Sequence, residues 1–227
     1  MRADDHLPAR CLAEALGTAF LLLAVVGSGI MADRLTDSVG LALLANTIAT
    51  TATLFALILA FAAVSGAHFN PAVSLANWFA GCLSSRALLC YLLAQCGGAL
   101  LGVAVAHVLF ELPIVQHAST ARGSTAMAIA EVVATFGLLT IIRGAARHGV
   151  FAVAAAVAAF VAGGYWFTSS TCFANPAVTL GRAFTDTFAG IRGSDVPRFL
   201  VGQLLGAGLA ILAARVLDRA GSPSKNP

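Results

Sequence analysis

Charged side chains are scarce in this sequence: 13 lysine and arginine residues and 10 aspartate and glutamate residues among 227. The net charge of +3 is too small and too dispersed for a surface that binds nucleic acid. Hydrophobic residues make up 59% of the chain, and the mean hydropathy is +0.90. This balance is typical of a protein that crosses a membrane several times.

Cysteine is also rare, and its five positions show no metal-ligand spacing. We expect four of them to be buried free thiols that pack as small hydrophobic side chains. The fifth, Cys172, differs because it lies beside a repeated motif described below. The other four are Cys11, Cys82, Cys90 and Cys96. We expect no catalytic residue, no cofactor and no metal.

Long apolar segments dominate what is present, and six of them have the 20 or so residues needed to cross the roughly 30 Å core of a bilayer. The charged start of the chain, with Asp4 and Asp5, does not resemble a cleavable signal peptide. The polar tail 222–227 is predicted to be disordered. The predicted spans are 11–32, 40–63, 86–110, 125–142, 149–168 and 197–217.

One short motif occurs twice between these spans. Residues 65–75 read SGAHFNPAVSL and residues 171–180 read TCFANPAVTL, so both contain Asn-Pro-Ala-Val. Asn is a strong N-cap, and Pro fits the first position of a helix, where its missing N–H has no cost. The motif therefore predicts a helix start at Asn70-Pro71-Ala72 and at Asn175-Pro176-Ala177.

The two helices that follow these motifs are too short to cross a bilayer. Their apolar runs predict helices at 71–80 and 176–187, and ten residues span only about 15 Å. Interrupted segments in matching positions of two halves are the sequence pattern of a transport site at the membrane midplane. Both helix N-termini would direct partial positive charge toward that site.

The two halves of the chain repeat beyond this motif. Glu14 and Glu131 occupy similar Ala-Glu segments 117 residues apart, and YLLAQ at 91–95 resembles FLVGQ at 199–203. Three spans in each half reverse the direction of the second half, which predicts an inverted-topology repeat. The predicted fold class is an all-α membrane protein with six transmembrane helices and two half-membrane helices. The repeats are 1–118 and 119–227.

Basic residues predict the orientation in the membrane. With both termini on one side, that side carries eight basic residues and the other carries five, which favours cytoplasmic termini. Small residues that permit close helix packing are expected to be scaffold. They include Gly97, Gly98, Gly102, Gly202, Gly206 and Gly208.

The doubled Asn-Pro-Ala, the preceding SGAHF and the paired Ala-Glu helices resemble the aquaporin and aquaglyceroporin (major intrinsic protein) family over nearly the whole chain. The resemblance implies a right-handed six-helix bundle, one pore per subunit and a homotetramer in contact with membrane lipid. It also implies that Asn70 and Asn175 direct amide donors into the pore.

The family usually carries arginine directly after the second Asn-Pro-Ala, as part of a selectivity filter, but here that residue is Val178. Counting along the chain without gaps places the other filter positions at Thr50, Gly163 and Cys172, and Gly164 is the nearest alternative to Gly163. Valine at this position, together with the segment YWFTSST at 165–171 that leads into the second motif, resembles bacterial members linked to arsenic resistance. That likeness suggests a bacterial inner membrane.

Five further residues have alternative roles. Glu14 and Glu131 are expected to brace the two loops through backbone N–H groups, and the alternative is a proton relay. His68 either lines the cytoplasmic vestibule or hydrogen-bonds its loop. Arg182, one turn beyond Val178, either attracts oxyanions in the outer vestibule or is an exposed residue that pairs with Asp186. Cys172 is either a reactive thiol near the filter or an inert wall residue.

We therefore predict a passive channel for small, mainly uncharged solutes. Likeness to the family suggests glycerol-like polyols, arsenite and antimonite hydroxides, methylated arsenicals and water. The alternative is an ion-coupled secondary transporter, for which only Glu14, Glu131 and His68 could bind a driving ion. An intramembrane enzyme would need a nucleophile with a base or a metal, and Ser65, His68 and Cys172 do not form such a group.

Overall fold

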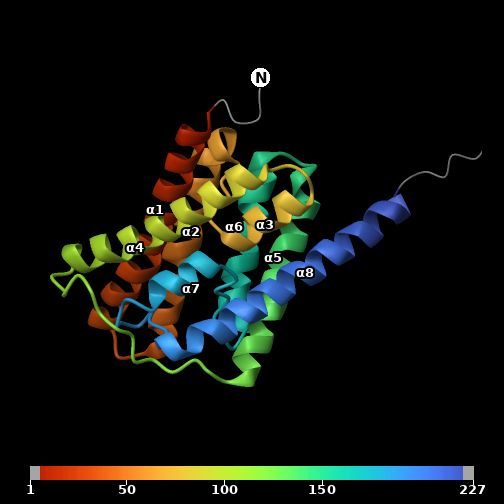
Figure 1. Ribbon diagram of the computed structural model, residues 1–227. Coiled ribbons are helices and arrows are strands. Elements are labelled where there is room, and N and C mark those ends of the chain that lie inside the picture. The colour runs from red at the N-terminus through yellow and green to blue at the C-terminus, as the bar shows by residue number, and fades with distance from the viewer. Residues whose placement is uncertain (1–5, 222–227) are drawn as a thin grey trace, which may run out of the picture.

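The computed structural model describes residues 6–221, and within them it contains helices and no strand (Figure 1). The predicted tail 222–227 lies outside the described residues. Six helices are long and apolar enough to cross a membrane. They are α1 (Leu7–Leu35), α2 (Val39–Ser65), α4 (Ser85–Leu109), α5 (Thr125–Ala146), α6 (Val150–Phe167) and α8 (Val196–Gly221), and they confirm the predicted fold class.

Two short helices, α3 (Pro71–Phe79) and α7 (Pro176–Arg182), lie between the long ones (Figure 1). Each begins as its motif predicts, with proline in the first turn and asparagine as the N-cap. Asn70 Oδ1 accepts the backbone N–H of Ala72 at 2.8 Å, and Asn175 Oδ1 accepts that of Ala177 at 3.0 Å.

Helix α7 ends at Arg182, five residues before the predicted end at 187. The chain leaves the helix there because the segment after it bonds to the loop between α4 and α5. The backbone oxygen of Ala183 accepts from the N–H of Ala118 at 3.1 Å, and the N–H of Asp186 donates to Gln116 Oε1 at 2.8 Å. These bonds replace the helical bonds of one further turn.

Each half of the bundle contains a close crossing of two long helices, α1 with α4 and α5 with α8. A side chain at Gly98 of α4 would overlap the backbone oxygen of Ala15 in α1, and one at Gly202 of α8 would overlap that of Ala128 in α5. Glycine is therefore required at both crossings, as expected for packing in lipid. Two of the glycines predicted as scaffold, Gly97 and Gly208, face open space instead.

Large apolar side chains cover the outward faces of the bundle. Phe20, Leu44, Leu101, Val201 and Leu205 are all exposed, although a water-soluble protein would bury most such residues. In a bilayer these faces meet acyl chains, and the buried polar residues described below lie on the inside.

Candidate functional site

The loops before α3 and α7 meet in the interior of the bundle. Asn70 Nδ2 donates to the backbone oxygen of Ala174 at 2.8 Å, and Asn175 Nδ2 donates to that of Phe69 at 2.8 Å. Each asparagine therefore caps its own helix and also binds the opposite loop. Because an amide nitrogen carries two N–H groups, each asparagine keeps one donor beyond this cross-bond.

Both loops adopt left-handed backbone conformations that are rare for residues other than glycine. In the first loop Ala67 has a φ of 52° and Phe69 a φ of 49°. In the second loop Thr171, Cys172 and Ala174 have φ values of 61°, 52° and 46°. Such conformations persist only where surrounding contacts fix them.

Glu14 supplies those contacts in the first half. Its carboxylate is fully buried and accepts the backbone N–H groups of His68 at 2.9 Å and Phe69 at 2.6 Å. Ser65 Oγ and Gln95 Nε2 donate to the same carboxylate at 2.6 and 2.8 Å. All of these groups converge on one buried acid, which fixes the loop against α1.

Glu131 has the equivalent position in the second half. It is fully buried and accepts the N–H groups of Phe173 at 3.0 Å and Ala174 at 2.8 Å. Gln203 Nε2 donates to it at 2.6 Å, as Gln95 does to Glu14. Because both carboxylates are occupied by loop donors, these contacts fit bracing better than a proton relay.

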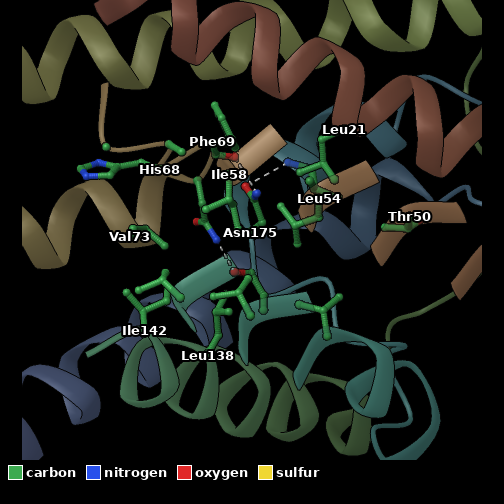
Figure 2. A pocket seen from close by; sticks show the side chains of 18 of the residues that line it. Leu21, Thr50, Leu54, Ile58, His68, Phe69, Val73, Leu138, Ile142 and Asn175 are labelled. Atoms are coloured by element: carbon green, nitrogen blue, oxygen red, sulfur yellow. Dashed lines mark hydrogen bonds between the residues drawn. The ribbon is translucent and has the colours of Figure 1, made fainter. Parts of the chain in front are cut away.

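A cavity of about 400 Å³ runs past the meeting point of the two loops. Figure 2 shows Asn175 in the middle of this cavity, with His68 toward one end and Thr50 toward the other. Most of the wall is aliphatic, including Leu21, Ile58 and Leu138. Among its described lining residues there is no carboxylate. A solute at the centre meets amide donors within an apolar wall.

His68 contacts both the cavity and helix α3. Its side chain lines the cavity, and its Nδ1 lies 3.0 Å from Ser74 Oγ in α3. The ring also packs edge-on against Tyr91, at 5.4 Å between centroids.

Three of the four predicted filter residues, Thr50, Cys172 and Val178, line the cavity. Gly163 is exposed on α6 and is not among the lining residues, which corrects the register of that prediction. Tyr165, two residues further along α6, lines the cavity in its place. Gly164 faces the thiol of Cys172, and a side chain there would overlap the sulfur.

Arg182 is buried, with 4% of its surface exposed, and it lines the cavity one turn beyond Val178. Its guanidinium carbon lies 3.5 Å from the centroid of the Phe173 ring, and its Nε donates to the backbone oxygen of Ala189. Arg122 approaches the same ring at 5.3 Å. Two guanidinium groups therefore gather around Phe173. This cluster was not predictable from the sequence, because Arg122 lies in a distant loop.

The expected pairing of Arg182 with Asp186 is not what the described residues show. Asp186 instead accepts the backbone N–H and the hydroxyl of Ser119, at 2.9 and 2.8 Å. These two hydrogen bonds lower the pKa of the Asp186 carboxyl below its ordinary value. Within residues 6–221, Arg182 therefore lines the cavity without an ion pair to a carboxylate.

Comparison with known proteins identifies one family. Residues 5–149 match the family described as major intrinsic protein. Aquaglyceroporin AqpS of Rhizobium meliloti (strain 1021) is 48% identical over 220 residues, which cover 97% of this chain and 94% of that protein. The chain belongs to the major intrinsic protein family.

Two further similarities concern the family more broadly. The glycerol uptake facilitator protein of Pseudomonas aeruginosa is 34% identical over 131 residues, which are 56% of this chain and 46% of that protein. The X-ray structure of the aquaglyceroporin from Plasmodium falciparum matches with a TM-score of 0.70 at 21% identity, covering 94% of this chain and 99% of that one. The chain is therefore an aquaglyceroporin-type membrane channel for small solutes, and not an enzyme.

We predict that Cys172 of this major intrinsic protein channel reacts with thiol reagents that enter the cavity. Its side chain lines the cavity and is 4% exposed, so a bound mercurial would occupy space that solutes need. We expect an organomercurial to reduce solute uptake into proteoliposomes, and Cys172→Ser to be resistant. Cys96→Ser is the matched control, because Cys96 is half-buried and not among the lining residues. Equal block of wild type and Cys172→Ser would contradict a reactive thiol in the lumen.

Proposed function

We propose that this channel passes solutes larger than water because Val178 occupies the position at which the family usually carries an arginine. Val178 belongs to α7 and lines the cavity among apolar side chains. An arginine there would add bulk, five donors and a fixed charge, and valine adds none of these. This position in the cavity wall is the observation that carries the proposal.

The proposed solutes are glycerol-like polyols, arsenite and antimonite hydroxides, methylated arsenicals and water. The names of the relatives in Rhizobium meliloti and Pseudomonas aeruginosa support the polyol class. A neutral hydroxylated solute also fits a wall that is mostly aliphatic, with amide donors at its centre. Permeability of purified protein in liposomes to water, glycerol, arsenite and a methylated arsenical, measured side by side, tests the assignment. Liposomes that take up water alone would contradict it.

Ion-coupled transport is the rival mechanism, and the buried acids argue against it. Glu14 and Glu131 are occupied by loop donors and do not belong to the described lining of the cavity. His68 is the remaining candidate of the three that the sequence offered. A glycerol flux that tracks a proton or sodium gradient across the liposome membrane would favour the rival.

We further propose that the channel is a homotetramer of inverted repeats, 1–118 and 119–227, in a bacterial inner membrane with cytoplasmic termini. The family supports the tetramer, and the exposed apolar faces provide surface for both subunits and lipid. Chemical cross-linking of the protein in membranes tests the tetramer, since four bands up to the tetramer are expected. Cross-linked bands no larger than the dimer would contradict the tetramer.

Arg182 is proposed to favour acidic solutes at the outer mouth of the pore. Arg182→Leu should lower the ratio of methylarsenate uptake to glycerol uptake about tenfold, which corresponds to about 1.4 kcal/mol of lost attraction. Arg182→Lys keeps the charge but loses the planar group that stacks on Phe173, so we expect an intermediate ratio. An unchanged ratio in Arg182→Leu would remove this role.

A further inference from the structure

A groove of about 350 Å³ lies between α5 and α8, and none of its described lining residues lines the solute cavity. Its walls include the exposed side chains of Ile129, Val201 and Leu205, so the groove opens on the outward face of the bundle. Thr125 and Arg198 are its polar lining residues. The rest of the described lining is apolar and also includes Ala128, Val132, Pro197 and Gly202.

The groove follows one stripe of residues on each helix. The α5 stripe is 125, 128, 129 and 132, and the α8 stripe is 198, 201, 202 and 205. Both have the spacing i, i+3, i+4, i+7, which places side chains on one face of a helix. Each stripe begins with its polar residue and continues with apolar ones or glycine. Two turns of helix make the apolar part about 11 Å long.

The floor of the groove is the close crossing of the two helices. A side chain at Gly202 would lie 2.6 Å from the backbone oxygen of Ala128, and one at Gly206 would lie 2.5 Å from that of Val132. Each helix advances by four residues between these contacts, so α5 and α8 run in the same direction. Small residues at the floor leave a furrow between the larger side chains on either side.

Arg198 lies at the end of the groove where both helices begin. Its side chain is exposed, and its Nη1 donates to the backbone oxygen of Gly123, directly before Ser124, the N-cap of α5. The guanidinium is therefore held beside the first turn of α5, where Thr125 carries its hydroxyl. Backbone N–H groups in the first turn of a helix lack intrahelical partners and favour a negative charge.

The charges around Arg198 leave it available to an anion. Asp195 lies beside Gly123, but its carboxylate already accepts from Arg192 at 3.2 Å and from the backbone N–H of Arg122 at 2.8 Å. Among residues 6–221, Arg198 forms no ion pair. This end of the groove therefore carries more positive than negative charge, at the edge of a face that lipid covers.

The first half of the chain lacks both features of this groove. The matching segments are CYLLAQ at 90–95 and RFLVGQ at 198–203. Cys90 therefore stands where the second half has Arg198, and Ala94 where it has Gly202. The cation and the glycine floor belong to the second half and not to the repeat as such.

We propose that the groove binds one anionic phospholipid per chain. The phosphate accepts from Arg198 and Thr125 at the N-terminal ends of α5 and α8, and one acyl chain lies along the two-turn apolar stripe. Arginine close to the membrane surface attracts anionic lipid headgroups. A zwitterionic phospholipid offers the same acyl chains, but its headgroup carries a cation that opposes Arg198. The headgroup therefore decides the preference, because neighbouring lipids supply equally apolar surface.

Native mass spectrometry of the detergent-solubilised channel tests the site, with phosphatidylglycerol and phosphatidylcholine of identical acyl chains as probes. We expect phosphatidylglycerol to bind about tenfold more tightly, because its net negative charge allows a charge-assisted hydrogen bond that no second cation opposes. Arg198→Gln should remove this difference, and Arg198→Lys should keep part of it. Arg86→Gln is the matched control, because Arg86 is exposed in the first turn of α4 and does not line the groove. Equal phosphatidylglycerol affinity in wild type and Arg198→Gln would overturn the proposal.

A second pair of variants tests the apolar part of the site. Val201→Trp should fill the groove and weaken the binding of both lipids, whereas Leu204→Trp adds the same bulk at an exposed position outside the groove. Unchanged lipid binding in Val201→Trp would overturn the proposal. Displacement of the lipid by inorganic phosphate would show a simple anion site instead. A change of oligomeric state in Val201→Trp alone would show that a second copy of the chain covers the groove, and would equally overturn it.

Discussion

Uptake of glycerol and arsenite into proteoliposomes is expected to fall about tenfold or more in Val178→Arg, an increase of at least about 1.4 kcal/mol in the barrier. Val178 is 5% exposed and lies in the cavity wall, so a longer side chain at this position extends into the lumen. The guanidinium would narrow the path and place a second positive charge one turn from Arg182. Water is small enough to pass, so the ratio of water to glycerol permeability should rise.

Val178→Leu is the matched control, because leucine adds about one methylene and no charge. We expect it to reduce glycerol uptake far less than arginine does. Size-exclusion chromatography of each variant in detergent establishes that equal amounts of folded protein are compared. Glycerol uptake by Val178→Arg at the wild-type rate would show that Val178 does not limit passage.

The short helices were predictable because their signals are local. Asn70 and Asn175 cap the helices through their own side chains, and Pro71 and Pro176 follow directly. Six long apolar runs likewise gave six spans, and only their ends moved by a few residues. Such features depend on neighbours in the sequence and not on the tertiary structure.

The filter register was not predictable, because α6 is apolar on every side. Gly163 faces outward and Tyr165 faces the cavity, but the flanking alanine, valine and phenylalanine residues look alike from the sequence. In a water-soluble protein a polar face would distinguish the two sides, whereas here lipid and the pore wall both accept apolar residues.

Arg182 shows a second limit of the sequence. The predicted helix to 187 placed Arg182 in mid-helix, while the actual end at Arg182 lets the following segment fold back and bury it. The bonds that cause this fold come from residues 116–119, more than sixty positions away. Contacts between distant segments therefore decide where Arg182 lies, and a single sequence does not record them.

The second large effect concerns the buried acid of the second half. Glu131 receives the N–H groups of Phe173 and Ala174, which belong to a loop with left-handed residues. Without the carboxylate both donors remain buried and unpaired, and each unpaired donor costs about 1–3 kcal/mol of stability. Gln203 would also lose its 2.6 Å contact. The loop would then have no fixed conformation, and Asn175 would leave its position in the cavity.

We therefore expect Glu131→Ala to abolish solute uptake and to lower the thermal stability of the purified channel by the equivalent of several kcal/mol, since the costs of two or more unpaired groups accumulate. Glu131→Gln keeps one acceptor oxygen and should lose less. Stability is measured as the monodisperse fraction after heating in detergent, and Glu111→Ala serves as control because Glu111 is exposed in a loop. A stable Glu131→Ala protein that still conducts would mean that the loop is held by α7 and the asparagine cross-bonds alone. A stable protein whose uptake loses only its dependence on a proton gradient would instead revive the relay.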